Sequence, residues 1–256
     1  MSEATDTFDA VERLIADERF GARLTVVAGE PVGARAVTDV ENGLVAGDLP
    51  PSIRDSVLAD AAVLVDREMA ATLSYDGVDV FIEPLIPRPR LIIFGAVHIA
   101  QALSDHAALL GFHVTVSDAR GSFITAERFP SADELAVGWP DEVVDRLPLD
   151  RRASVVVLSH DARFEDPLWP LLLPTSVRYI GAMGSKRTAD RRRERLLAQG
   201  FDEDAVNRIH GPVGLDIGAD SPGEVAVAIL AEMISARRRP HETPELVGER
   251  RPLVPA

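Results

Sequence analysis

The sequence predicts an α/β protein in which a doubly wound parallel sheet follows a smaller N-terminal α+β domain. Two observations support this fold class. From Leu91 to Ala236, strand patterns alternate with helix patterns, as expected of βαβ units that form a parallel sheet. Before that alternation, the stretch Pro84–Arg90 contains three prolines, which lack an amide donor and restrict the residues before them. Regular structure is therefore interrupted between two domains.

We place the domain boundary in that proline-rich stretch. The prediction is a small α+β domain over 1–88 and a Rossmann-like domain over 89–238. From Pro240 onward there are four prolines among mixed charges, so we expect 239–256 to be a flexible tail or an arm that reaches a neighbouring protomer.

In the N-terminal domain, a hairpin is the clearest local signal. Asp76-Gly77 lies between two apolar runs, which is typical of a tight β-turn. A proline favours the first turn of a helix, so Pro51 marks a helix start. The predicted elements are helices over 8–16 and 51–65, and strands over 22–28, 69–75 and 78–81.

In the second domain, end signals define the helices. Gly111 and Gly200 follow helical patterns as C-caps, and Ser221 with Glu224 forms a capping box. The run Ala153–Leu158 is almost wholly apolar and suits the middle of a parallel sheet. We predict strands over 91–94, 112–117, 153–158 and 177–180, helices over 99–110, 189–199, 202–209 and 222–236, and short segments of undecided type over 132–137 and 141–147.

A nucleotide-binding fingerprint joins the first strand of this domain to its helix. The residues Gly95-Ala96-Val97-His98-Ile99-Ala100 match G-x-G-x-x-G/A except at the middle glycine, where Val97 stands. That glycine normally lets a pyrophosphate approach the backbone. The pattern predicts a Rossmann domain and makes NAD(P) a poorer ligand, with an empty cofactor site as the alternative.

Composition limits the partners. The 256 residues carry a formal net charge of −14, of which residues 1–88 contribute −10, so duplex nucleic acid is an unfavourable partner. No apolar run approaches the ~20 residues of a membrane span. The start, Met1–Asp6, is acidic and unlike a secretory signal, and we expect a cytoplasmic protein.

The chain has no cysteine, which excludes disulfides, thiolate metal sites and a cysteine nucleophile. Its six histidines show no metal-ligand spacing, and neither G-x-S-x-G nor H-E-x-x-H occurs. Nothing favours a hydrolase or a metalloenzyme, and we predict no metal site and no catalytic residue.

Polar residues follow the predicted strands, where open α/β sheets bind ligands. Asp118 comes 23 residues after Gly95, near the spacing of a ribose-binding carboxylate, and Arg120 suits a phosphate. The alternative is that Asp118 caps the next turn. His160, beside Asp161, follows the apolar strand and suits either a ligand contact or a structural role in the loop.

A second glycine loop, Gly184-Ser185-Lys186-Arg187, again leads from a strand into a helix. Its amides and two cations predict an anion site, although Lys186 alternatively begins a solvated helix face. Lys186 is the only lysine beside 26 arginines. The arginine-rich run over 191–195 is predicted to be a solvated face. In the last loop, Gly211–Gly218, Asp216 is either a ligand contact or part of a buried turn.

Five blocks of this sequence resemble the XdhC/CoxI family of accessory proteins for xanthine dehydrogenase and carbon monoxide dehydrogenase. The blocks keep the family's order and spacing across 83–235, while the resemblance is faint across 1–82. They are LIIFGAVHIAQA at 91–102, FITAERFP at 123–130, VVVLSHD at 155–161, YIGAMGSKR at 179–187 and PVGLDIGADSPGEVAVAILAE at 212–232.

The resemblance implies a maturation role. Such proteins bind molybdenum cofactor, promote exchange of an oxo for a sulfido ligand, and deliver the product to an apo-hydroxylase. The family blocks point to the following binding residues: Gly95, His98, Asp118, Arg120, His160, Asp161, Gly184, Ser185, Lys186, Arg187, Gly214 and Asp216. A homodimer is also expected.

The sequence departs from the family pattern at two places. Val97 replaces the second glycine of a G-A-G-H motif, and the N-terminal G-G-C-x-x-E-like segment has no match, the nearest stretch being Asn42–Asp48. Without cysteine, sulfur is expected to arrive on a partner, a cysteine desulfurase. The favoured hypothesis is a cofactor-delivery protein rather than an enzyme; the alternatives are an NAD(P)-dependent oxidoreductase and a non-catalytic nucleotide-binding module.

Overall fold

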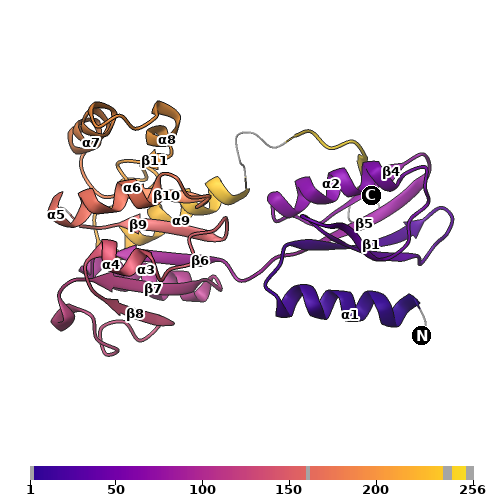
Figure 1. The fold of residues 1–256 in the computed structure, drawn as a ribbon, viewed down its shortest axis with the longest axis horizontal. Coiled ribbons are helices and arrows are strands. Elements are labelled where there is room, and N and C mark those ends of the chain that lie inside the picture. Colours follow the sequence, from indigo (N-terminus) through magenta and orange to yellow (C-terminus); the bar gives the residue numbers. More distant parts are fainter. Residues whose placement is uncertain (1–2, 160–161, 239–243, 252–256) are drawn as a thin grey trace. The chain divides into compact units, whose positions relative to one another are not determined.

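A computed structural model describes residues 3–159, 162–238 and 244–251. The chain divides into two compact units (Figure 1). One comprises Met1–Pro87 together with Arg237–Ala256, and the other comprises Arg88–Ala236. The fold class predicted from the sequence, a parallel doubly wound sheet accompanied by a smaller α+β part, is confirmed.

The first unit is an antiparallel sheet with a helix on each face. Its strand order is β12-β4-β5-β1-β2-β3. Leu14 of α1 packs against Val37 on one face, while Val57 and Leu64 of α2 pack on the other with Leu24. Its elements are α1 (Glu3–Ala16), β1 (Gly21–Ala28), β2 (Arg35–Asp39), β3 (Gly43–Gly47), α2 (Arg54–Asp66), β4 (Ala71–Tyr75), β5 (Val78–Leu85) and β12 (Glu249–Arg251).

The expected flexible tail is partly a strand. Arg250 of β12 pairs with Leu73 of β4, which adds an edge to the N-terminal sheet. The described part of this segment is fixed by buried Asp60, which accepts hydrogen bonds from the amides of Val247 and Gly248 at 2.7 Å each. The sequence showed no alternating apolar pattern here because backbone amides, rather than side chains, make these bonds.

The second unit is a six-stranded sheet in which every neighbouring pair is parallel. Its elements are β6 (Arg90–Phe94), α3 (His98–Leu109), β7 (His113–Asp118), η1 (Gly121–Phe123), β8 (Glu134–Val137), α4 (Pro140–Val144), β9 (Ala153–Val157), α5 (Ala162–Glu165), η2 (Asp166–Leu168), α6 (Trp169–Leu172), β10 (Tyr179–Ala182), α7 (Lys186–Ala198), α8 (Glu203–Asn207), β11 (Ile209–His210) and α9 (Pro222–Arg238).

The strand order, β11-β10-β9-β6-β7-β8, is that of a Rossmann sheet. The chain builds outward from β6 to β8, returns, and builds outward again from β9 to β11. The order therefore reverses between β6 and β9, and this is where such sheets leave a crevice at their carboxyl ends.

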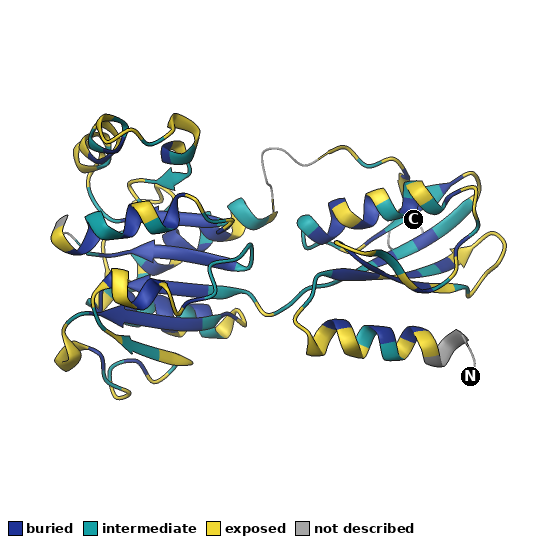
Figure 2. Ribbon diagram, in the orientation of Figure 1, coloured by how far each residue is buried: buried dark blue, intermediate teal, exposed yellow. Residues whose placement is uncertain are grey.

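Both faces of this sheet are covered by helices. One face packs against α3 and α9, for example Leu103 and Ile229; the other packs against α6 and α7, for example Trp169 and Leu196. The central strands are accordingly buried along their length (Figure 2). This explains why the run at 153–158 is apolar without alternation.

Candidate functional site at the carboxyl edge of the parallel sheet

The loops after β6 and β9 meet at the point where the strand order reverses. Gly95 has φ +111°, and a Cβ built there would lie 3.2 Å from the amide nitrogen of Ser159. A side chain at this position would therefore strain the backbone and crowd the amide of Ser159. The two residues that follow Ser159, His160 and Asp161, are predicted site residues that lie outside the described part of the chain.

Asp118 braces the turn that follows β6. Its Oδ2 accepts a hydrogen bond of 2.8 Å from the amide of Ala96 and another of 2.8 Å from Nη2 of Arg120. Its Oδ1 accepts 2.9 Å bonds from the amide and from Nε of Arg120. A carboxylate offers about four acceptor positions, and all are filled here.

The structure thus shows Asp118 in the capping role that was the alternative to ribose binding. Burial raises the pKa of this carboxyl, but the hydrogen bonds from Arg120 and Ala96 outweigh burial and hold the pKa below its ordinary value. The carboxylate is 3% exposed and stays ionised. It holds the Arg120 guanidinium and the Ala96 amide in place.

Two arginines flank the same turn. Arg120 lies with its guanidinium 4.3 Å from the ring centroid of Phe123, and its side chain is 57% exposed. Arg128 donates from Nη2 to the carbonyl of Ala96 at 3.2 Å. Arg128 and Phe123 lie in the family-like block at 123–130 but were not predicted as site residues, because the contact of Arg128 with Ala96 depends on how the loop after β7 folds back.

Val97 ends the turn and is the N-cap residue of α3. Its backbone is extended, with φ −91° and ψ 175°, and no side chain caps this helix within the described part of the chain. The Val97 side chain is partly buried against the core, and the predicted site residue His98 is exposed. A β-branched side chain therefore stands at the position where a Rossmann fingerprint has a glycine.

The loop after β10 presents two cations. Gly184 has φ +142°, and Ser185 caps α7 by accepting from the amide of Thr188. Lys186 and Arg187 are exposed and have no ion-pair or hydrogen-bond partner among the described residues. An anion at this helix start would meet free amides, the positive end of the helix dipole and two charges.

Within the arginine-rich run, Arg192 is not part of a solvated face as predicted. It is 3% exposed and pairs with buried Glu165, with its Nη2 3.1 Å from Oε2 of Glu165. The same Nη2 donates to the carbonyl of Met183 at 2.9 Å. The helix turns this one arginine inward, where it fixes the strand end from which the loop of Gly184 starts.

The last loop is held against α9. A Cβ at Gly214 would lie 3.1 Å from the amide nitrogen of Ile229, and the amide of Leu215 donates to the carbonyl of Ala228 at 3.2 Å. Asp216 is exposed and makes no hydrogen bond in the described part of the chain. The buried-turn alternative for Asp216 is therefore not observed.

Glu232 of α9 takes the anchoring role instead. It accepts a 2.8 Å hydrogen bond from the amide of Gly214 and one from the Tyr179 hydroxyl, and its Oε1 lies 3.2 Å from Nδ1 of His210. Burial raises the pKa of Glu232, but the bonds from His210, Tyr179 and Gly214 outweigh it and lower the pKa below its ordinary value. The one feature of the sequence that could have indicated this role is the position of Glu232, a carboxylate within the apolar stretch of α9.

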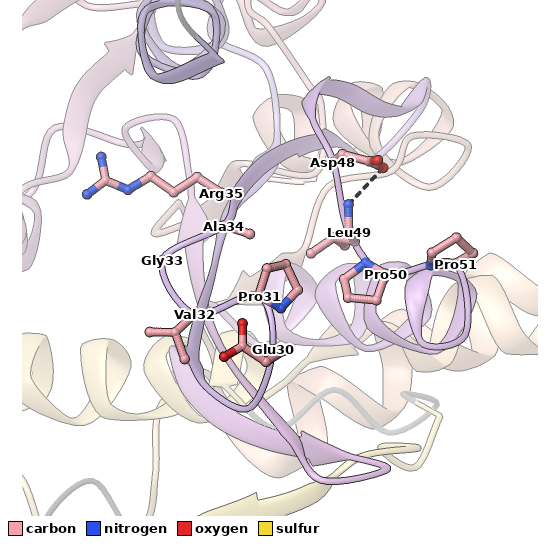
Figure 3. Close-up of a pocket in the computed structure, with 10 residues that line it drawn as sticks. All are labelled: Glu30, Pro31, Val32, Gly33, Ala34, Arg35, Asp48, Leu49, Pro50 and Pro51. Carbon is pink, nitrogen blue, oxygen red and sulfur yellow. Dashed lines mark hydrogen bonds between the residues drawn. The ribbon is translucent and has the colours of Figure 1, made fainter.

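A separate pocket lies in the first unit (Figure 3). It has a volume of about 890 Å³ and is formed by the turn between β1 and β2 and by the stretch between β3 and α2. None of the residues predicted to bind a ligand lines it. Its lining consists of Glu30, Pro31, Val32, Gly33, Ala34, Arg35, Asp48, Leu49, Pro50 and Pro51.

The strand order, the glycine turn after β6 and the cationic loop after β10 define a Rossmann-fold protein. Its described site residues lie at strand ends, on loops and in the first turns of helices at the carboxyl edge. The family model described as the XdhC Rossmann domain matches residues 91–233, which is more than half of the chain. The chain belongs to the XdhC family.

Known proteins support the same relationship. The chain is 34% identical over 161 residues to a probable xanthine dehydrogenase component of Bacillus subtilis, an alignment that covers 63% of this chain and 47% of that protein. It is 25% identical over 193 residues to the molybdenum cofactor insertion chaperone PaoD of Escherichia coli, covering 75% and 53%. The chain thus spans about half the length of these relatives.

A solved structure shares the fold over nearly the whole chain. The crystal structure of a xanthine dehydrogenase from Bacillus halodurans superposes with a TM-score of 0.55 at 20% identity, covering 96% of this chain and 98% of that one. At this identity the likeness shows the fold alone.

No helix in the described residues has the length and apolar character needed to cross a membrane.

Proposed function

We propose that this chain is an accessory protein that binds molybdenum cofactor, assists its sulfuration and inserts it into a molybdenum hydroxylase of the xanthine dehydrogenase or carbon monoxide dehydrogenase type. The observation that supports it best is the pair of cations without a partner among the described residues, Lys186 and Arg187, at the start of α7 in a member of the XdhC family. The name of the relative PaoD supports cofactor insertion as the role.

The cofactor is cargo, and the carboxyl edge supplies its contacts. Molybdopterin carries a phosphate, which suits the amides and charges at Ser185, Lys186 and Arg187. In this proposal Gly95 and His98, which follow β6, and Gly214 and Asp216, in the last loop, supply further contacts to the cofactor. Asp118 acts by positioning Arg120.

The partners follow from the same proposal. A chain without cysteine carries no persulfide, so sulfur is brought by a cysteine desulfurase. The client is the apo-hydroxylase, and the setting is the cytoplasm. We also propose a homodimer that uses exposed apolar residues of α9, Val227 and Ile234, and light scattering after size exclusion tests it.

Titration of the purified protein with molybdenum cofactor, NADH and NADPH in parallel tests the function. We expect cofactor binding that weakens about tenfold or more in Lys186→Ala, since a charge-assisted phosphate contact is lost. Lys186→Arg should retain most of the affinity. Arg13→Ala, which removes an exposed cation from α1 of the other unit, is the matched control and should bind as the wild type does.

The titration also separates the alternatives. Binding of NADH or NADPH without cofactor binding would reject the delivery role and favour the oxidoreductase, because the Val97 side chain would then not obstruct a pyrophosphate. If none of the three ligands binds, the delivery role is rejected and a non-catalytic module is favoured.

A further inference from the structure

An exposed aromatic ring lies beside two arginines directly after β7. Phe123 ends η1 and is 41% exposed. The guanidinium of Arg120 is 4.3 Å from its ring centroid, and that of Arg128 is 5.4 Å away. We refer to Phe123, Arg120 and Arg128 as the Phe123 platform.

The platform is held in place by hydrogen bonds. Arg128 donates from Nη1 to the carbonyl of Phe123 at 2.7 Å and from Nη2 to the carbonyl of Ala96. Arg120 is held by two parallel bonds to Asp118, at 2.9 and 2.8 Å. Long side chains that are already ordered lose little conformational entropy when a ligand binds.

The platform is also joined to the turn after β6. Asp118 binds the amide of Ala96 and Arg128 binds its carbonyl, so both arginines are fixed relative to the residue that precedes the N-cap of α3. A ligand on Phe123 would therefore lie at the same edge of the sheet as the β6 turn.

Its chemistry suits a planar heteroaromatic ring with a phosphate. An exposed aromatic ring and a guanidinium plane both stack on such rings, and stacking is tolerant of ring identity. Nη1 of Arg120 has no partner among the described residues, which leaves a charged donor for a phosphate oxygen. Asp118, with its acceptor positions filled, offers nothing to sugar hydroxyls.

We propose that the Phe123 platform binds the flat ring of a pterin or nucleobase and that Arg120 contacts an adjacent phosphate. Asp118 makes no hydrogen bond to the sugar hydroxyls in this arrangement. This rests on the proposed function, because both ring types belong to the molybdenum cofactor or its nucleotide-linked form. It adds residues outside the cofactor-binding set inferred from the sequence, and it replaces ribose recognition at Asp118 by ring stacking.

The first test uses small probes and the full chain. We expect 6-hydroxymethylpterin phosphate, CMP or both to bind, with ligand ring protons shifted upfield in NMR spectra by the Phe123 ring. Ribose 5-phosphate, which has no ring to stack, should bind at least about tenfold more weakly. Comparison of the two ring probes identifies whether the platform takes the pterin or the base.

Variants then assign the effect to Phe123. Phe123→Leu should remove the upfield shift and weaken ring-probe binding about tenfold, whereas Phe123→Tyr should restore both. Phe8→Leu is the matched control, since Phe8 is also exposed but lies on α1. An unchanged shift and affinity in Phe123→Leu would overturn the platform.

A deoxy probe tests the part assigned to Asp118. Because its acceptors are filled, dCMP should bind within about twofold of CMP; a large preference for CMP would show that the carboxylate reads ribose after all. The failures are distinguishable. Wild-type cofactor binding that is insensitive to Phe123→Leu rejects the platform alone, and stacking of small probes without cofactor binding rejects the delivery role alone.

Discussion

Single carboxylates hold the loops of the candidate site in place. Glu232 joins β10, β11 and the last loop through Tyr179, His210 and Gly214. Burial of Tyr179, reinforced by the charge and hydrogen bond of Glu232, raises the pKa of its hydroxyl, so the tyrosine remains a donor. One ionised side chain thereby helps to fix the last loop, together with the hydrogen bond from the Leu215 amide to the Ala228 carbonyl.

We predict that Glu232→Gln lowers the free energy of unfolding by about 1–3 kcal/mol at neutral pH, because a charged acceptor for three donors is lost. The lowered pKa of Glu232 means that its contribution is fully present above its ordinary pKa of 4.5 and declines as pH falls through the lower folded value. Urea unfolding of both proteins from pH 7 to pH 3 measures the difference, which should narrow on acidification. A difference that grew at low pH would contradict this account.

At the scale of elements, helix α7 places a buried arginine next to an exposed one. Arg192 is buried with Glu165, while Arg191 is exposed. The inward arginine ties α7 to α5 and to the carbonyl of Met183 at the end of β10. The position of the cationic loop therefore depends on a buried ion pair one and a half turns into the helix.

Arg192→Ala should destabilise the protein by about 3–5 kcal/mol, since it leaves Glu165 as a buried charge without its partner. Arg191→Ala, the adjacent control, should change the free energy of unfolding by no more than about 0.5 kcal/mol. The double variant Arg192→Met with Glu165→Met should recover much of the loss, because no charge is then left buried. Equal unfolding midpoints in urea for Arg191→Ala and Arg192→Ala would refute the buried pair.

At the scale of the molecule, the chain returns to the sheet where it began. Strand β12 pairs with β4, and Asp60 binds the two amides that precede it as well as the Tyr75 hydroxyl at 2.8 Å. Burial and the neighbouring Asp60 raise the pKa of Tyr75, so its hydroxyl stays protonated and donates. The first unit is thus built from both ends of the sequence.

Asp60→Ala is expected to release this segment. Limited proteolysis with mass spectrometry should then show cleavage within 244–251 at least about tenfold faster than in the wild type, because opening no longer breaks the two hydrogen bonds from Val247 and Gly248 to Asp60. Asp55→Ala, an exposed carboxylate on the same helix, should leave the cleavage rate unchanged. Cleavage of Asp60→Ala at the wild-type rate would show that β12 is held by other contacts.

Local signals along the chain were enough to predict the Rossmann sheet, its glycine turn and the positions of the polar loops, because apolar runs, caps and glycines act on their near neighbours. They did not predict β2, β3, β11 or β12, which are stabilised by pairing with other strands, nor the inward turn of Arg192. Only the folded chain shows that hydrogen bonds from Ala96 and Arg120 occupy the acceptor positions of the Asp118 carboxylate. The same is true of the exposure of Phe123 beside two guanidiniums. Hydrogen bonds and ring contacts between distant residues depend on how the loops fold in three dimensions. The spacing of residues in the sequence does not determine that loop conformation.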